Sequence, residues 1–178
     1  RLGAKLENLK NVNDKILKNA YENQLSVNKI HKCCLSVLDS KNIPELFMKL
    51  FDEFPIFLKI NSLKIVLEKT FQLDGDIKNI KHASQEELIG FSKFVGLTES
   101  RLVILREDLS YEHRFNLGLD SAQDNVESEA ILSLNIKNKS LGFIFLEANN
   151  KKTFSIDQAT DYLEFLSKII SKQIENLS

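Results

Sequence analysis

Four consecutive side chains in the middle of the sequence, Tyr111–Arg114, combine a phenol, a carboxylate, an imidazole and a guanidinium. They supply an acid, a base and a cation within one short stretch. The surrounding segment, 108–128, is polar and irregular, and segments of this kind often carry ligand contacts. The same four residues are also typical of an exposed helical turn in a loop, and both interpretations stay open here.

Two further arginines, Arg101 and Arg106, flank a short apolar run. Either guanidinium could hold an anionic ligand or could simply be solvated at a strand end. The candidate ligand-binding residues are Arg101, Arg106, Tyr111, His113 and Arg114. We expect any ligand to contact segment 71–126, on the sheet face away from the terminal helices, because those helices are committed to the opposite face.

The other reactive residue types form no catalytic or metal-binding pattern. His31 and Cys33 are two residues apart in a predicted helix, where their side chains point to different faces and cannot chelate one ion. Gly90 and Gly96 are the closest pair of glycines, so the sequence has neither G-x-G-x-x-G nor a P-loop. Ser133 lacks the His and Asp spacing of a triad. We therefore expect no metal, no cofactor and no enzymatic activity.

An apolar heptad runs through the first 37 residues of the chain. Alternating steps of four and three residues give the seam Leu2, Leu6, Leu9, Asn13, Ile16, Ala20, Asn23, Val27, Ile30, Cys34 and Val37. No proline or glycine interrupts 4–42. A sustained period of 3.5 residues is typical of helices that coil around one another. The pattern predicts a dimerisation helix over 1–40.

The two asparagines of this seam indicate how the helices pair. Asn13 falls at an a position and Asn23 at a d position. A buried asparagine at an a position pairs best with its own copy in register, which favours a parallel homodimer. The C-terminal helix is expected to pack alongside, giving a four-helix arrangement. The alternative is that the helix folds back on its own domain, because further apolar residues widen the stripe beyond a strict seam.

Behind this helix, helical and strand-like periodicities alternate. Asn42–Glu45 and Ser84–Glu87 are typical helix starts, each with a capping side chain followed by Glu at the third position. Strands are expected at 63–68, 77–80, 102–105, 130–136 and 141–147, and a last helix at 156–177. The run at 102–105 would also fit a short helix. The order predicts an α+β fold, a central antiparallel sheet flanked by helices.

Composition and charge narrow the classes of partner and the compartment. The net charge is −1, so no overall field attracts nucleic acid. The first 41 residues hold eight Lys or Arg and four Asp or Glu, which is typical of a solvated helix face or of docking to an acidic partner. No apolar run is long enough to span a bilayer. Cys33 and Cys34 are adjacent and form no disulfide framework, which points to the cytoplasm.

Several stretches of the sequence resemble the bacterial DUF484 family, whose members carry a GAF-like domain behind an N-terminal helix. The stretches that carry the resemblance are Asn19–Leu25, Ile30–Leu38, Leu46–Phe54, Ser128–Leu134, Leu141–Leu146 and Phe154–Leu166. The loop Glu147–Phe154 departs from the family pattern, which tends to have Gly-Ser and an Arg before the Phe.

This resemblance implies a GAF-like fold, and GAF domains generally bind small molecules or act as dimeric signalling modules. The cyclic-nucleotide signature N-K-F-D-E is absent, and both cysteines precede the domain, so a bilin site and a cysteine-based sulfoxide reductase site are not expected.

The sequence thus predicts a GAF-like domain at 41–178 behind the helix. The expected function is a dimeric regulatory or sensory module without enzymatic activity that binds a small molecule. Two alternatives remain: a coiled-coil scaffold that binds a protein partner but no ligand, and an enzyme that uses Tyr111–Arg114.

Overall fold

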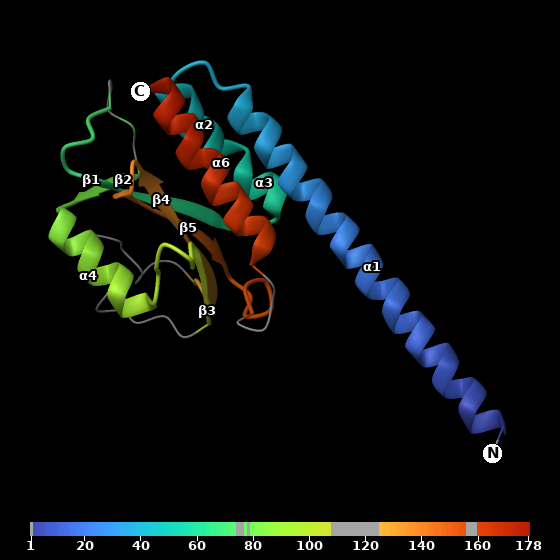
Figure 1. The fold of residues 1–178 in the computed structure, drawn as a ribbon. Coiled ribbons are helices and arrows are strands. Elements are labelled where there is room, and N and C mark those ends of the chain that lie inside the picture. The colour runs from blue at the N-terminus through green and yellow to red at the C-terminus, as the bar shows by residue number, and fades with distance from the viewer. Residues whose placement is uncertain (1, 74–76, 78, 108–124, 156–159) are drawn as a thin grey trace.

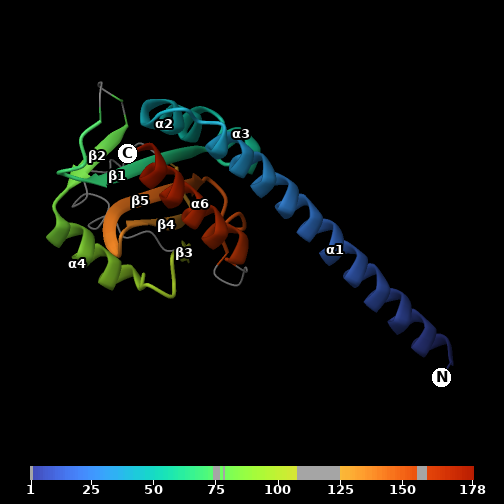
Figure 2. The same cartoon turned by 45° about the horizontal axis from the view of Figure 1, so that its top comes forward.

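The computed structural model describes the chain except for residues 1, 74–76, 78, 108–124 and 156–159, and except for the side chains of residues 19 and 21–25. Its elements are α1 (Leu2–Leu38), α2 (Ile43–Asp52), α3 (Phe54–Leu58), β1 (Ser62–Glu68), β2 (Ile80–Ala83), α4 (Gln85–Val95), β3 (Val103–Arg106), β4 (Ser128–Ile136), β5 (Lys139–Ala148) and α6 (Asp161–Leu177). Figures 1 and 2 show the domain as a sheet between helices, with α1 leaving it as a long rod.

The strands form one five-stranded sheet in the order β2-β1-β5-β4-β3. Three of its four pairings are antiparallel, as expected, and β1 with β2 is parallel. The centre is the β4–β5 hairpin. Its turn residues Lys137 and Asn138 both have positive φ, of 51° and 63°. Turns of this backbone type match the right-handed twist of the strands they join, which explains the tight connection.

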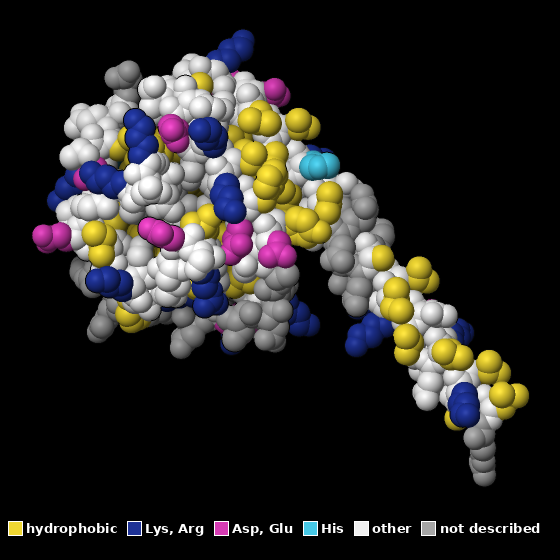
Figure 3. Space-filling model, in the orientation of Figure 1, with side chains coloured by type: hydrophobic (Ala, Val, Ile, Leu, Met, Phe, Trp, Pro, Cys, Tyr) yellow, Lys and Arg dark blue, Asp and Glu magenta, His cyan; other side chains and the backbone are white. Residues whose placement is uncertain are grey.

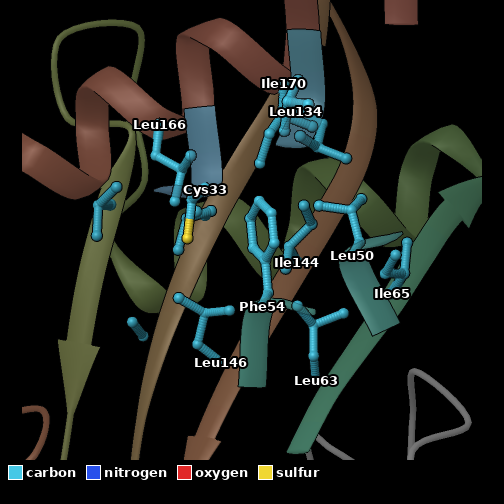
Figure 4. Packing of buried hydrophobic residues seen from close by; sticks show 14 of the residues in the cluster. Cys33, Leu50, Phe54, Leu63, Ile65, Leu134, Ile144, Leu146, Leu166 and Ile170 are labelled. Atoms are coloured by element: carbon cyan, nitrogen blue, oxygen red, sulfur yellow. The ribbon is translucent and has the colours of Figure 1, made fainter. Parts of the chain in front are cut away.

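The main core lies between the sheet and the helices α1, α2, α3 and α6. Strand residues alternate between the two faces, so one set from each strand points toward these helices. Figure 4 shows Cys33 of α1, Leu166 of α6 and Phe54 of α3 gathered over the strand residues Ile144 and Leu146. The last two turns of α1 are therefore part of the domain core and not only of a separate stalk.

A second, smaller core covers the other face of the sheet, where α4 packs through Leu88 and Phe91. The ring of Phe91 lies 5.2 Å from that of Phe143 and 5.7 Å from that of Phe145, measured between centroids. Tilted ring pairs at such distances add attraction beyond their buried area. This side of the sheet is therefore partly filled by aromatic side chains.

Local sequence signals explain where several helices begin and end. The Asn42 side chain accepts a hydrogen bond from the Glu45 N–H at 2.8 Å, and Ser84 forms the expected capping box with Glu87. Gly96 ends α4 with a φ of 90°. The predicted starts of both helices are confirmed. Pro55 lies in the first turn of α3, where its missing N–H is tolerated.

Other sequence expectations differ from the structure at their boundaries. The second strand occupies Ile80–Ala83 and not 77–80, and the ambiguous run at 102–105 is the strand β3. The helical turn expected near 111–117 lies outside the described residues.

Candidate functional site

Two glutamates lie fully buried on the α4 face of the sheet. Glu129 of β4 and Glu147 of β5 are direct partners in the register of the hairpin, and neither side chain is exposed to solvent. Each lies two residues from a member of the smaller core, Ile131 and Phe145, so it points to the same face. Carboxylates are rarely buried without partners, since desolvation of a charge costs several kcal/mol or more.

A cation on each flank neutralises this pair. The Arg106 Nε lies 3.6 Å from Glu129 Oε1, and the Lys64 Nζ lies 3.5 Å from Glu147 Oε1. The Ser62 hydroxyl donates a hydrogen bond of 2.9 Å to the same Glu147 oxygen. Lys64, Glu147, Glu129 and Arg106 thus form a line across four strands, with two carboxylates between two cations, which we call the buried ionic row. It places charges next to the apolar side chains of the smaller core.

The structure describes two of the five candidate ligand-binding residues, Arg101 and Arg106. Arg106 belongs to the buried ionic row, whereas Arg101 is exposed, and its backbone N–H closes a turn with the Thr98 hydroxyl at 3.0 Å. Tyr111, His113 and Arg114 lie outside the described residues. The sequence interpretation overlooked the two buried glutamates and Lys64. One signal in the sequence could have revealed them. In each strand a charged residue occupies a position where the alternating pattern places a buried apolar side chain.

The two cysteines are structural residues of the core. Burial raises the pKa of Cys33 from 9.0 to about 12, with smaller electrostatic contributions from the adjacent Cys34 and from Glu53, and burial also raises the pKa of Cys34. Both thiols are therefore protonated at neutral pH and are poor nucleophiles. Within the part of the chain that the structure describes, no group of three or more His, Cys, Asp or Glu could hold a metal ion.

The free half of α1 carries the second candidate site. Six large apolar side chains on it are between 54% and 76% exposed: Leu2, Leu6, Leu9, Val12, Ile16 and Leu17. We call these six residues the α1 stripe. Figure 3 shows yellow apolar side chains along this half of the helix and again at its junction with the domain. Soluble proteins rarely leave a continuous apolar surface of this kind in water.

The predicted heptad seam divides into two parts in the structure. Leu2, Leu6, Leu9 and Ile16 are exposed, together with Asn13 and Ala20, whereas Val27 is half-buried and the Asn23 side chain is not described. Ile30, Cys34 and Val37 lie in the core of the same chain. These last three positions are thus occupied by contacts with α2, α3, α6 and the sheet, which leaves the first half of the seam open to a second molecule.

None of the described helices is both long and apolar enough to cross a bilayer. A family model described as "Protein of unknown function, DUF484" matches residues 1–178. The chain belongs to the DUF484 family. The resemblance found in the sequence is therefore confirmed, and the architecture above confirms the α+β class. No curated protein matches the chain.

Among solved structures, this DUF484 chain is similar to one described as fRMsr of Staphylococcus aureus in complex with substrate. The identity is 18% and the TM-score 0.49, over 84% of this chain and 95% of the other. The prediction that the chain is not an enzyme is wrong as stated, because this neighbour is a methionine sulfoxide reductase. Sequence spacing could not exclude an activity, since catalytic groups meet through the fold rather than along the chain. The likeness assigns no reaction to this chain.

Proposed function

We propose that this DUF484 protein is a dimeric sensory or regulatory module. In this proposal, α1 of one copy pairs with α1 of a second copy, and the domain binds a small molecule on the α4 face of the sheet. The observation that carries the dimer is the α1 stripe, because those six side chains are exposed and belong to neither core among the residues that the structure describes.

The size of the stripe supports a dimer of useful stability. Burial of a large aliphatic side chain contributes about 1.5–3 kcal/mol, so six of them contribute on the order of 10 kcal/mol per helix. Association itself costs roughly 4–15 kcal/mol in lost freedom of motion. Two helices together therefore contribute on the order of 20 kcal/mol when the stripe is fully buried, which exceeds this cost. Any further contact near the domain would add to the stability of the dimer.

Exposed apolar residues at the junction of α1 with the domain indicate where that further contact would form. Leu35 and Leu38 on α1 are 62% and 55% exposed, and Phe165 on α6 is 53% exposed. Helices α1 and α6 pack against each other within the chain. A parallel pairing places both domains at the same end, so that α6 of each copy can join the α1 pair in a four-helix arrangement.

Sedimentation of the full chain tests the dimer. We expect the wild-type chain to sediment as a dimer at micromolar concentration. The double variant Leu6→Glu with Leu9→Glu puts charges into the stripe and should sediment as a monomer with unchanged helix content in the domain. The matched control, Lys15→Glu with Lys18→Glu, changes charge on the opposite side of the same helix and should remain dimeric. A monomeric wild-type chain would refute the proposal.

The buried ionic row supports the choice of the α4 face for a ligand, because fixed charges in an apolar setting can orient a polar molecule. Native mass spectrometry of the purified full chain reports copy number and any retained small molecule in one measurement. Retention of a molecule that the variant Arg106→Gln releases, while the dimer persists, is the expected result. Retention unaffected by this variant would place the ligand elsewhere.

A scaffold without a ligand is the second candidate function. It is favoured by the aromatic packing of Phe91, Phe143 and Phe145, which fills part of the α4 face with the chain's own side chains. An intact dimer that retains no small molecule and shows no thermal shift with metabolites would favour this candidate over the sensory one.

A further inference from the structure

A groove of about 570 Å³ lies apart from both candidate sites. Its walls come from four places: the C-terminal end of α4, the segment that leads into β3, the β4–β5 hairpin, and the side of α6 next to β4 with the exposed Lys168 and Lys172 beside it. Hydroxyl and amide side chains dominate the lining, and Leu97 and Leu102 are its two apolar members. The volume falls in the range of small-molecule sites, and the lining of hydroxyl and amide groups beside two leucines suits a ligand that has both polar and apolar surface.

Hydroxyl groups in this groove are arranged as donors. The Asn135 N–H donates to Ser171 Oγ at 3.2 Å. A hydroxyl that accepts in this way keeps its own proton for another acceptor. The Ser140 hydroxyl is buried and has no hydrogen-bond partner within the described part of the chain. A buried hydroxyl without a partner costs about 1–3 kcal/mol, so an acceptor brought by a ligand would recover that cost.

Two lysines, Lys168 and Lys172, and two glutamates, Glu99 and Glu175, line the groove, so its formal charges balance. Lys168 lines the groove from the exposed side of α6 and makes no ion pair with any residue that the structure describes. Its neighbour Lys172 lies 4.0 Å from Glu175, which is a weak, exposed pair. Figure 3 shows Lys and acidic side chains interspersed over the face that α6 crosses. Within the described part of the chain, the groove therefore offers the Lys168 ammonium without an ion pair, beside the hydroxyl groups of Ser140 and Ser171.

We infer that this groove binds a small hydroxylated anion, a molecule with several hydroxyl groups and one carboxylate or phosphate. Lys168 would pair with the anionic group, and Ser140 and Ser171 would donate to its oxygens. Charge-assisted hydrogen bonds of this kind are the stronger class. The inference stands apart from the proposed dimer and from the buried ionic row, since it uses none of their residues.

Titration of the ¹⁵N-labelled full chain tests this inference with four probes: glucose 6-phosphate, gluconate, glucose and inorganic phosphate. We expect the first two to shift the amide signals of 133–140 and 167–172 in a saturable way, and glucose to leave them unchanged. A preference for glucose 6-phosphate over gluconate would identify a phosphate site, and the reverse a carboxylate site. Binding of inorganic phosphate as tightly as either would contradict the role of the hydroxyl groups.

Two variants and one control complete the test. Lys168→Gln should weaken binding of the preferred probe by about tenfold, and Ser140→Ala should weaken it measurably while the spectrum elsewhere stays native. Lys32→Gln removes an exposed lysine of α1 and should bind like the wild type. The inference is overturned if none of the anions shifts the groove signals, or if Lys168→Gln binds them as well as the control.

Discussion

Arg101 and Arg106 stand on either side of β3 in opposite environments. The Arg106 side chain is 11% exposed and faces the fully buried Glu129, whereas Arg101 is exposed to solvent. In a region of low dielectric the arginine compensates a desolvated carboxylate, and its loss would leave that charge without its cation. At the surface, water solvates a charged group, so the loss of an exposed arginine leaves no charge unsolvated. Two residues of identical chemistry should therefore differ sharply in what they contribute to stability.

Arg106→Leu is expected to lower the free energy of unfolding by about 3–5 kcal/mol, the usual cost when one partner of a buried ion pair is removed. Arg101→Leu is its matched control and should change that free energy by no more than about 0.5 kcal/mol. Urea denaturation followed by circular dichroism measures both. Equal effects of the two substitutions would show that the buried ionic row does not stabilise the fold.

Because of Cys33, the free energy of unfolding of the domain should decrease as the pH rises into the alkaline range. Its folded-state pKa of about 12 exceeds the ordinary value of 9.0, so the folded chain keeps a proton that the unfolded chain loses. This stabilisation is complete below pH 9 and is lost as the pH rises from about 9 toward 12. Between pH 8 and 10 the loss should be on the order of 1 kcal/mol.

The difference between the wild type and Cys33→Ala isolates this effect, because every other titrating group is shared. The variant is less stable at neutral pH, since a buried side chain has been shortened. The gap in unfolding free energy should narrow between pH 8 and pH 10. A constant gap would mean that the thiol does not remain protonated in the folded chain.

At the scale of elements, two glycines show how backbone conformation limits substitution. Gly142 in β5 has a φ of +149°, and a Cβ built on it would lie 1.9 Å from the Val66 carbonyl oxygen of the neighbouring strand. Gly90 lies on the exposed side of α4, and a Cβ there would meet nothing within 4 Å. The first position requires glycine for both conformation and space, and the second does not.

Gly142→Ala should therefore destabilise the chain by at least about 2 kcal/mol, because β1 and β5 must separate to admit the methyl group. Gly90→Ala should instead stabilise it by about 0.5–1 kcal/mol through helix propensity. Thermal unfolding of both variants and the wild type measures whether each substitution raises or lowers the melting temperature. A neutral Gly142→Ala would show that the close approach of β1 and β5 is not maintained in solution.

The sequence was most informative where a local rule decides the structure. The caps at Asn42 and Ser84 rest on contacts within a few residues, and both helix starts were predicted. The two central strands were predicted from the apolar pattern of their own residues. The parallel pairing of β1 with β2 was not, because it depends on residues that only the folded chain brings together. The same reason hid the buried ionic row, whose four members come from four strands.

At the scale of the whole molecule, the two halves of α1 have different surroundings, because the first half is exposed and the last turns are buried in the domain. Its first half carries the α1 stripe, and its last turns place Ile30, Cys33, Cys34 and Val37 in the core. The heptad predicted one helix correctly, yet could not distinguish the turns that pack on the chain's own domain from those that stay exposed, since apolar side chains at this spacing fit either arrangement. We therefore propose that the domain begins near residue 26 rather than at 41.

Two shortened chains test this boundary. A chain that starts at Ser26 keeps all four buried side chains and should unfold cooperatively as a monomer. A chain that starts at Lys41 loses them, at a cost of roughly 5–10 kcal/mol, which is comparable to the entire stability of a small domain. It should show no cooperative thermal transition. If the Lys41 chain melts like the Ser26 chain, the end of α1 is not part of the domain.

The unbroken course of α1 has a geometric consequence for any dimer. The helix is continuous from Leu2 to Leu38, about 55 Å at 1.5 Å per residue, and a regular helix transmits rotation about its axis along its length. The direction in which the side chains of the free end point is thus set by how Ile30, Cys33, Cys34 and Val37 pack in the core. If that core repacked, α1 would rotate about its axis, and the α1 stripe would turn toward or away from a partner helix. The residues of the stripe would keep their positions relative to one another.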